Sequence, residues 1–164
     1  MRILGIDPGS RFTGFGIIEV RGDQAVCIAQ GVIKVGTGAF PQRLGIIFEG
    51  VQQLIREHQP DQAAVETVFV SHNAGSALKL GQARGAAVCA AIAAGLEVAE
   101  YSPRSVKQAI VGKGSADKVQ VQHMVRILLS ASEAFAEDAA DALAVALCHQ
   151  HTSQTLERMQ RLQG

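Results

Sequence analysis

The first third of the chain contains three segments rich in apolar, β-branched and aromatic residues. They cover residues 2–7, 12–20 and 25–35, and turn-forming residues separate them at 8–10 and 21–23. Segments of this composition and length are typical of β-strands. Because the connections are short, we expect neighbouring antiparallel strands, and therefore a three-strand meander.

From residue 44 onward the pattern changes to alternating helices and strands. Apolar residues over 44–55 recur at every third or fourth position, which predicts an amphipathic helix, and the apolar run 63–68 predicts a buried strand. When a strand, a helix and a second strand follow one another along the chain, the two strands are expected to pair in parallel. The remaining predicted elements are an Ala- and Gly-rich helix over 76–96, a short strand over 97–101, a helix starting at Ser102 and Pro103, and helices over about 117–129 and 137–150.

Together these elements predict an α/β fold. We expect a mixed sheet of five strands, the three-strand antiparallel meander plus parallel strands, flanked by helices. A length of 164 residues suits one compact core. We therefore expect a single domain over residues 1–151, followed by a polar, frayed C-terminal tail over 152–164.

The composition excludes several classes of protein. Hydrophobic residues make up 48% of the chain and charged residues 18%, which excludes a disordered protein. No apolar run is long enough to cross a membrane, and the first residues lack the layout of a signal peptide. The 3 cysteines lie in apolar segments and are expected to be buried, reduced thiols. These features lead us to expect a cytoplasmic protein.

The chain carries no net charge, yet its charges are unevenly distributed. Residues 71–126 contain 7 Lys and Arg against 3 Asp and Glu, whereas residues 127–164 contain 2 against 5. A zero total by itself argues against a nucleic-acid partner. Positive charge concentrated in the middle of the chain makes such a partner compatible with the sequence.

Four acidic residues occupy unusual positions. Asp7 ends an apolar strand and Glu66 lies within another, where a carboxylate is costly unless it is paired, protonated or bound to a cation. Asp138 and Asp141 are three residues apart and share one face of a predicted helix. Carboxylate oxygens suit Mg²⁺ or Mn²⁺ better than zinc.

Each acid also has an ordinary structural alternative. Asp138 and Asp141 could cap a helix and compensate its dipole, Glu66 could pair with an arginine, and Asp7 could open a turn before Pro8. A shared metal site explains all four positions together. Two divalent ions held by carboxylates support phosphodiester hydrolysis, which needs mainly positioning and neutralisation of charge.

Four stretches of the sequence resemble the RuvC family of bacterial Holliday-junction resolvases. They are GIDPGSRFTGFG at 5–16, SALKLGQARG at 76–85, VKQAIVGKGSADKVQVQHMV at 106–125 and EDAADALAVALCH at 137–149. The resemblance extends over nearly the whole chain. The departures from the usual family pattern, none of which touches the four acids, are Gly75, Ala86, Ala87 and the absence of a proline in 130–136.

The resemblance implies a ribonuclease-H-like fold and a metal-dependent endonuclease. Such an enzyme works as a homodimer, nicks two strands of like polarity in four-way junction DNA and leaves 5′-phosphate and 3′-hydroxyl ends. The family acts in homologous recombination and repair with the RuvA–RuvB branch-migration complex, and we expect two Mg²⁺ ions per site, with Mn²⁺ as a substitute. The family's catalytic, metal-binding acids fall on Asp7, Glu66, Asp138 and Asp141, and some relatives carry histidine at the position of Asp138.

Further residues are expected to contact DNA. By the resemblance, Phe69 stacks on an unpaired base and Asn73 lies beside it, although a core position is the commoner fate of phenylalanine. Lys107 and Lys118 match important lysines of the family and flank a glycine-containing loop that carries Lys113; a solvated helix face is the alternative. The arginines that could add contacts with the DNA backbone are Arg84, Arg104 and Arg126.

The residues Cys148, His149 and His151 do not form a zinc motif, because no matching pair of ligands exists elsewhere in the chain. His149 remains a candidate for hydrogen bonding to a metal ligand.

Three other functions compete with a resolvase. The segment GIDPGSRFTG is similar to a phosphate-binding hairpin of actin-like ATPases, but that fold needs two such lobes. A non-catalytic junction-binding module would lack one of the acids, and an RNA-processing nuclease would resemble residues 76–125 poorly.

Overall fold

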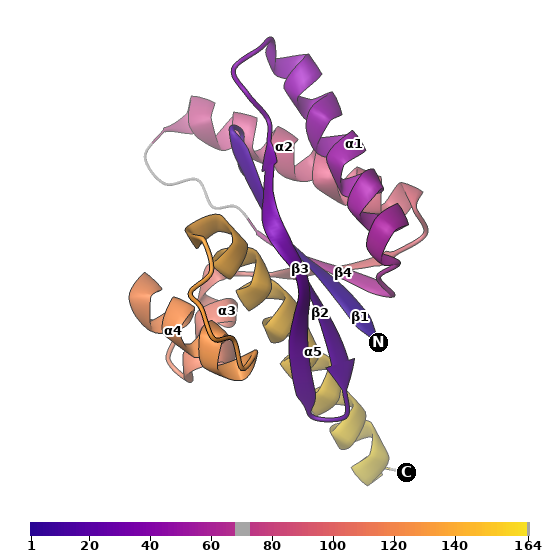
Figure 1. Cartoon of the computed structure of the whole chain (residues 1–164), viewed down its shortest axis with the longest axis vertical. Coiled ribbons are helices and arrows are strands. Elements are labelled where there is room, and N and C mark those ends of the chain that lie inside the picture. The colour runs from indigo at the N-terminus through magenta and orange to yellow at the C-terminus, as the bar shows by residue number, and fades with distance from the viewer. Residues whose placement is uncertain (68–72, 164) are drawn as a thin grey trace.

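A five-strand sheet runs through the centre of the molecule, with helices on both faces (Figure 1). The computed structural model describes residues 1–67 and 73–163. The strand order is β3-β2-β1-β4-β5, with β1, β2 and β3 antiparallel and with β4 and β5 parallel to β1. The predicted mixed sheet is therefore confirmed. The strands are β1 (Arg2–Asp7), β2 (Phe12–Arg21), β3 (Gln24–Lys34), β4 (Gln62–Glu66) and β5 (Glu97–Tyr101).

The helices divide between the two faces of the sheet. Helices α1 (Phe40–His58) and α2 (Ala74–Ala93) pack together over one face. Helix α5 (Glu137–Gln163) covers the other face, and α3 (Pro103–Val111) and α4 (Lys118–Leu128) pack against α5. In the part of the chain that the structure describes, no helix is long and apolar enough to cross a membrane.

Local sequence explains where the helices begin. The Ser102 hydroxyl accepts a hydrogen bond from the Ser105 N–H at 3.0 Å, as expected of a helix start before proline. Asp117 and Gln120 form a reciprocal capping box at the start of α4. Asn73 caps α2 through a 3.0 Å hydrogen bond from the Ser76 N–H, so this helix begins two residues earlier than predicted.

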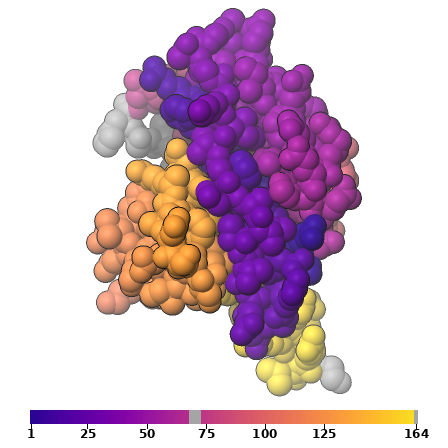
Figure 2. All heavy atoms as spheres, viewed as in Figure 1, coloured from indigo at the N-terminus to yellow at the C-terminus, as the bar shows by residue number. Residues whose placement is uncertain are grey.

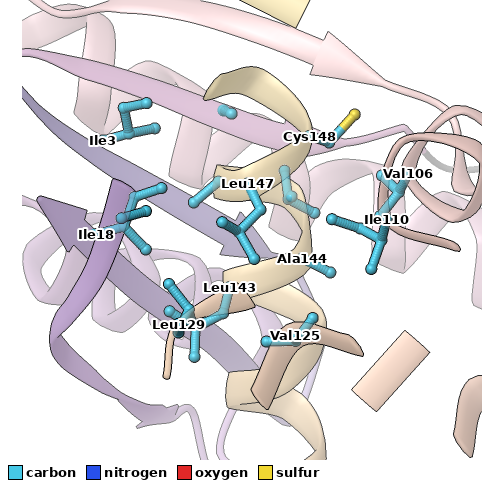
Figure 3. Packing of buried hydrophobic residues seen from close by; sticks show 14 of the residues in the cluster. Ile3, Ile18, Val106, Ile110, Val125, Leu129, Leu143, Ala144, Leu147 and Cys148 are labelled. Atoms are coloured by element: carbon cyan, nitrogen blue, oxygen red, sulfur yellow. The ribbon is translucent and has the colours of Figure 1, made fainter. Parts of the chain in front are cut away.

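The part of α5 that follows Asp141 is buried on all sides. Residues 142–150 are all buried, because the sheet lies on one side of the helix and α3 and α4 lie on the other. Figure 3 shows Leu143 and Leu147 of this helix pointing toward Ile3 and Ile18 of the sheet. The apolar sequence around the whole circumference of the helix is typical of such an enclosed position.

Glycines in two strands allow α5 to approach the sheet closely. A Cβ atom at Gly5 would lie 2.0 Å from the carbonyl oxygen of Ala142, and one at Gly14 would lie 2.2 Å from the carbonyl oxygen of Asp138. A Cβ atom at Gly16 would lie 2.5 Å from the Leu143 side chain. Any larger residue at Gly5 or Gly14 would push the helix backbone away from the sheet.

The C-terminal segment differs from the prediction. Residues 152–163 continue α5, whereas we expected the helix to end near Gln150 and the polar tail to fray. The extension is anchored to the β2–β3 turn, since the Gln154 amide donates to the Gly22 carbonyl at 3.0 Å and Arg158 pairs with Asp23 at 3.0 Å. The last turns project beyond the rest of the molecule in Figure 2. Residues 155–162 are exposed, as their polar composition suggests, but they are helical and not frayed.

We predict that Gly14→Ala destabilises the fold, because the added methyl group collides with the backbone of Asp138. The expected loss is about 1–3 kcal/mol in the free energy of unfolding, measured by urea denaturation. Gly45→Ala is the matched control, since a Cβ atom at this exposed helical position meets no atom within 4 Å. Equal stability of the Gly14→Ala variant and the wild type would contradict the close approach of α5.

Candidate active site

Two carboxylates meet at one edge of the sheet. Asp7 is the last residue of β1 and Glu66 is the last residue of β4. These strands are adjacent and parallel, and Ile6 is paired with Val65 immediately before the two acids. Because side chains alternate along a strand, Asp7 and Glu66 point to the same face as Ile3, which is the face covered by α5. Glu66 therefore ends its strand, whereas the sequence suggested a position inside it.

The close approach of α5 brings two further acids to the same edge. Asp138 lies over Gly14, whose backbone is paired with that of Asp7 across the β1–β2 ladder. Asp141 follows one helical turn later. The negative charges of Glu66, Asp141 and Asp138 all act on the Asp7 carboxyl. The structure thus gathers the four predicted acids at one end of the sheet.

A cavity of about 220 Å³ opens beside these acids. Its polar lining consists of two carboxylates, Glu66 and Asp141, and two lysines, Lys107 and Lys118. Apolar residues of α3, α4 and α5 form the remaining wall. The two lysines that the sequence associated with the site therefore face the same space as the acids.

Burial and mutual repulsion make the Asp7 carboxylate costly. Burial is the larger cause and the neighbouring carboxylates are the second, and together they raise the pKa of Asp7 to about 7, although Lys118 opposes the shift. Burial also raises the pKa of Glu66, with a further contribution from Asp141, while Lys107 and Lys118 oppose it. A divalent cation among these oxygens would relieve both causes.

Lys118 supplies a positive charge within the site. Its ammonium lies 3.0 Å from a carboxylate oxygen of Asp141 and also pairs with Glu137. Burial favours the neutral amine, but the two hydrogen-bonded carboxylates outweigh it and raise the pKa of Lys118. Burial raises the pKa of Asp141 as well, in spite of this lysine.

The donor set fits a hard divalent cation, but the acids do not stand in ligand geometry. Among residues 1–67 and 73–163, no three Asp, Glu, His or Cys side chains are close enough to hold one ion as they stand. One of the four carboxylates, that of Asp141, is instead paired with Lys118. Oxygen-only donors of this kind match Mg²⁺ or Mn²⁺.

The backbone of Glu66 is held by a neighbouring helix and strand. The Arg84 Nε–H donates to the Glu66 carbonyl at 3.2 Å, and the same guanidinium pairs with Glu100 at 2.5 Å. The next residue, Thr67, donates its N–H to the Tyr101 carbonyl at 2.8 Å. Arg84, which we expected at the DNA backbone, therefore makes a contact that supports the strand end.

The other described residues that we expected to contact DNA do not line the cavity. Lys113 is exposed in the loop before α4, and the aliphatic part of Arg104 packs against Gly114 in that loop. Asn73 is exposed, but its side-chain oxygen caps α2. Phe69 lies outside the described residues.

His149 takes part in a separate buried network. Its ring is hydrogen-bonded through Nδ1 to the Tyr101 hydroxyl at 2.7 Å and through Nε2 to the Gln62 side-chain oxygen at 2.9 Å. It lies eight positions after Asp141 along α5, which corresponds to about 12 Å of helix. His149 therefore links α5 to β4 and β5, and it does not hydrogen-bond any of the four acids.

Sequence reasoning missed one acid of the site. Glu137 and Asp141 are four residues apart, so they share a face of α5, and both contact Lys118. The i, i+4 spacing was visible in the sequence, but nothing in the sequence placed a lysine from another helix between the two carboxylates.

The family model for crossover junction endodeoxyribonuclease RuvC matches residues 3–149. Curated relatives described as crossover junction endodeoxyribonuclease RuvC include that of Methylococcus capsulatus, which is 58% identical over 161 residues. This match covers 98% of the present chain and 97% of the relative. The Dichelobacter nodosus protein is 57% identical over 155 residues, covering 94% and 88% of the two chains.

Solved structures agree with these matches. A Thermus thermophilus RuvC in complex with a Holliday junction substrate is 37% identical, with a TM-score of 0.89 and coverage of 94% of this chain and 96% of that one. The yeast mitochondrial Holliday junction resolvase Ydc2 shares the fold at 14% identity, with a TM-score of 0.74 and coverage of 98% and 82%. The chain belongs to the crossover junction endodeoxyribonuclease RuvC family.

Proposed function

We propose that this endonuclease hydrolyses a phosphodiester bond of four-way junction DNA at the acidic edge of its sheet. The observation that carries the proposal is the gathering of Asp7, Glu66, Asp138 and Asp141 beside a cavity that Lys107 and Lys118 also line. Mutually repelling carboxylates provide strong binding for a divalent cation, and the lysines offer charge to a phosphate.

The four acids would hold Mg²⁺, with Mn²⁺ as a substitute and two ions in the working enzyme. RuvC-family nucleases depend on metal; the identity and number of the ions are our proposal. When bound, the metal supplies an activated water and neutralises charge that develops on the phosphate. The protein's own contribution is positioning: Asp7 and Glu66 extend from rigid strand ends, and Arg84 fixes the backbone of Glu66.

We assign the basic side chains to the DNA backbone. Lys107 and Lys118 face the acids, so they would contact the phosphate that is cut or its immediate neighbour. Lys113 and Arg104 lie on the loop before α4 and on α3, where they would contact more distant phosphates. Phe69 and Asn73 precede α2, and the family resemblance supports stacking on an unpaired base there.

A homodimer is also part of the proposal. Helix α2 exposes an outward stripe whose larger members are Leu78 at 70% exposure and Ile92 at 58%. Gly81 and Gly85 lie between them, and a Cβ atom at either would meet no atom within 4 Å. An apolar stripe with small residues at its centre allows a second copy of α2 to pack closely, and the two-fold dimer would present two active sites to the junction.

The remaining assignments rest on the family resemblance. They are symmetric nicks in strands of like polarity, 5′-phosphate and 3′-hydroxyl ends, and cooperation with the RuvA–RuvB complex. We also infer a cytoplasmic location, where Cys27, Cys89 and Cys148 would stay free thiols. Of these, Cys148 is buried as expected, whereas Cys27 is half-buried and Cys89 is exposed. The competing ATPase function finds no support in a single five-strand sheet without a second lobe among the described residues.

We predict that purified protein nicks a synthetic four-way junction in Mg²⁺ and leaves it intact in EDTA. Asp7→Asn removes one charge from the metal site and should lower the cleavage rate by at least about 10³-fold, while gel-shift affinity for the junction stays within about threefold. Glu133→Gln, at an exposed position on the loop before α5, is the charge-matched control. Cleavage in EDTA would refute the carboxylate mechanism, and equal cutting of linear duplex would refute junction specificity.

The raised pKa of Asp7 predicts that the site destabilises the metal-free protein. The Asp7 carboxyl group binds a proton more tightly in the folded state than in the unfolded state. The free energy of unfolding therefore decreases as the pH rises from about 4 to 7, and it stays lowered above pH 7. In EDTA at pH 8, Asp7→Asn should therefore raise the melting temperature by roughly 3–8 °C, and the gain should vanish toward pH 4.

Differential scanning fluorimetry across this pH range measures the effect. Added Mg²⁺ should stabilise the wild type more than Asp7→Asn, since only the wild type retains the full carboxylate set. A melting temperature that falls in Asp7→Asn at pH 8 would show that Asp7 stabilises the fold and would contradict the proposed electrostatic cost.

A further inference from the structure

Glu137 adds a fifth carboxylate to the site. It is the first residue of α5, and its side chain is 65% exposed, compared with 26% for Asp141 one turn further along. Glu137 therefore lies at the mouth of the site and Asp141 lies deeper. Lys118, which is 50% exposed, contacts both.

The contact between Glu137 and Lys118 joins the first turns of two helices. Lys118 is the first residue of α4, where the dipole of that helix disfavours a positive charge. Its ammonium extends instead toward the first turn of α5, where Glu137 accepts a hydrogen bond from it. The structure thus offers Lys118 two partners, of which the outer one is not among the four acids of the metal site.

A phosphate that approaches Lys118 must compete with these partners. Exposed ion pairs are weak, so DNA can displace Glu137 at a small cost. Glu137 would then be left as an unpaired negative charge beside a negatively charged backbone. Both effects act against binding, and both depend on the Glu137 carboxylate.

We propose that Glu137 is a positioning residue that holds Lys118 in the free enzyme and releases it to a DNA phosphate, and that it thereby lowers the affinity of the enzyme for DNA. This inference rests on the proposed role of Lys118 as a phosphate ligand. Its function would be to weaken binding wherever few other contacts are made, so that tight binding requires the full set of junction contacts.

The test is the affinity for a fluorescein-labelled four-way junction in EDTA, measured by fluorescence anisotropy at several salt concentrations. Without divalent metal, the readout is independent of cleavage. Glu137→Gln should tighten the Kd about two- to fivefold at low salt and steepen the salt dependence of binding by up to about 0.9 in log–log slope, because no released carboxylate then offsets the charge that Lys118 brings to the phosphate. Glu137→Asp keeps the carboxylate and should return the Kd toward the wild-type value.

The Lys118→Met background shows whether the effect acts through the lysine. There, Glu137→Gln should improve binding less than it does in the wild type, because no ion pair remains to be broken. Glu133→Gln controls for the removal of an exposed acid that contacts no lysine of the site. An unchanged Kd in Glu137→Gln, an equal gain in the Lys118→Met background, or an equal gain in Glu133→Gln would each overturn the inference.

The same measurements separate this inference from the proposed function. If Lys118→Met binds the junction as tightly as the wild type, the assignment of Lys118 to phosphate fails. If Lys118→Met binds more weakly but Glu137→Gln binds no more tightly, the assignment of Lys118 stands and only the role of Glu137 fails.

Discussion

The close contact between α5 and the central strands is the constraint on which the site depends. Gly5 and Gly14 leave room for the helix backbone at Ala142 and Asp138, so the first turns of α5 lie directly against β1 and β2. This contact places helix acids beside strand acids that are more than 70 residues away in the sequence. The apolar core around Leu143 and Leu147 then holds the helix in that position (Figure 3). The same helix thus serves packing and the acidic site: its first two turns carry Asp138 and Asp141, and its buried middle anchors them.

The buried, mutually repelling carboxylates lower the stability that the packing of α5 provides. Burial and repulsion raise the pKa of Asp7 to about 7, so the metal-free site is less favourable than an uncharged one would be. Lys118 offsets part of this cost through its contact with Asp141. A site of this kind gives up stability in the free protein and gains affinity for a cation, which is a common compromise at catalytic centres. The role that we propose for Glu137 extends the same principle to DNA, because Glu137 pairs with the lysine that we assign to a phosphate.

Much of the fold could be predicted because its signals are local. Strand composition, turn residues and the caps at Ser102 and Asp117 are properties of short segments, and the five-strand sheet followed from them. Asp7 and Glu66 could be singled out from their costly positions, and Asp138 and Asp141 from their shared helix face and the resemblance to RuvC. The metal-binding role of the four acids stays a prediction. What could not be predicted depends on contacts between distant segments. The helical C-terminal segment is anchored by the β2–β3 turn through Arg158, Arg84 is bound to Glu66 and Glu100, and Glu137 is bound to a lysine of α4. Nothing in the sequence around these residues indicated these partners.

The most direct test of the central claim is the location of a bound metal. We would soak crystals of the wild-type enzyme in Mn²⁺ and measure anomalous scattering. The account predicts a peak within coordination distance of Asp7 and of at least one of Glu66, Asp138 and Asp141, with the Lys118 ammonium moved away from Asp141. A peak confined to other residues, or no peak at a Mn²⁺ concentration that supports cleavage, would contradict it.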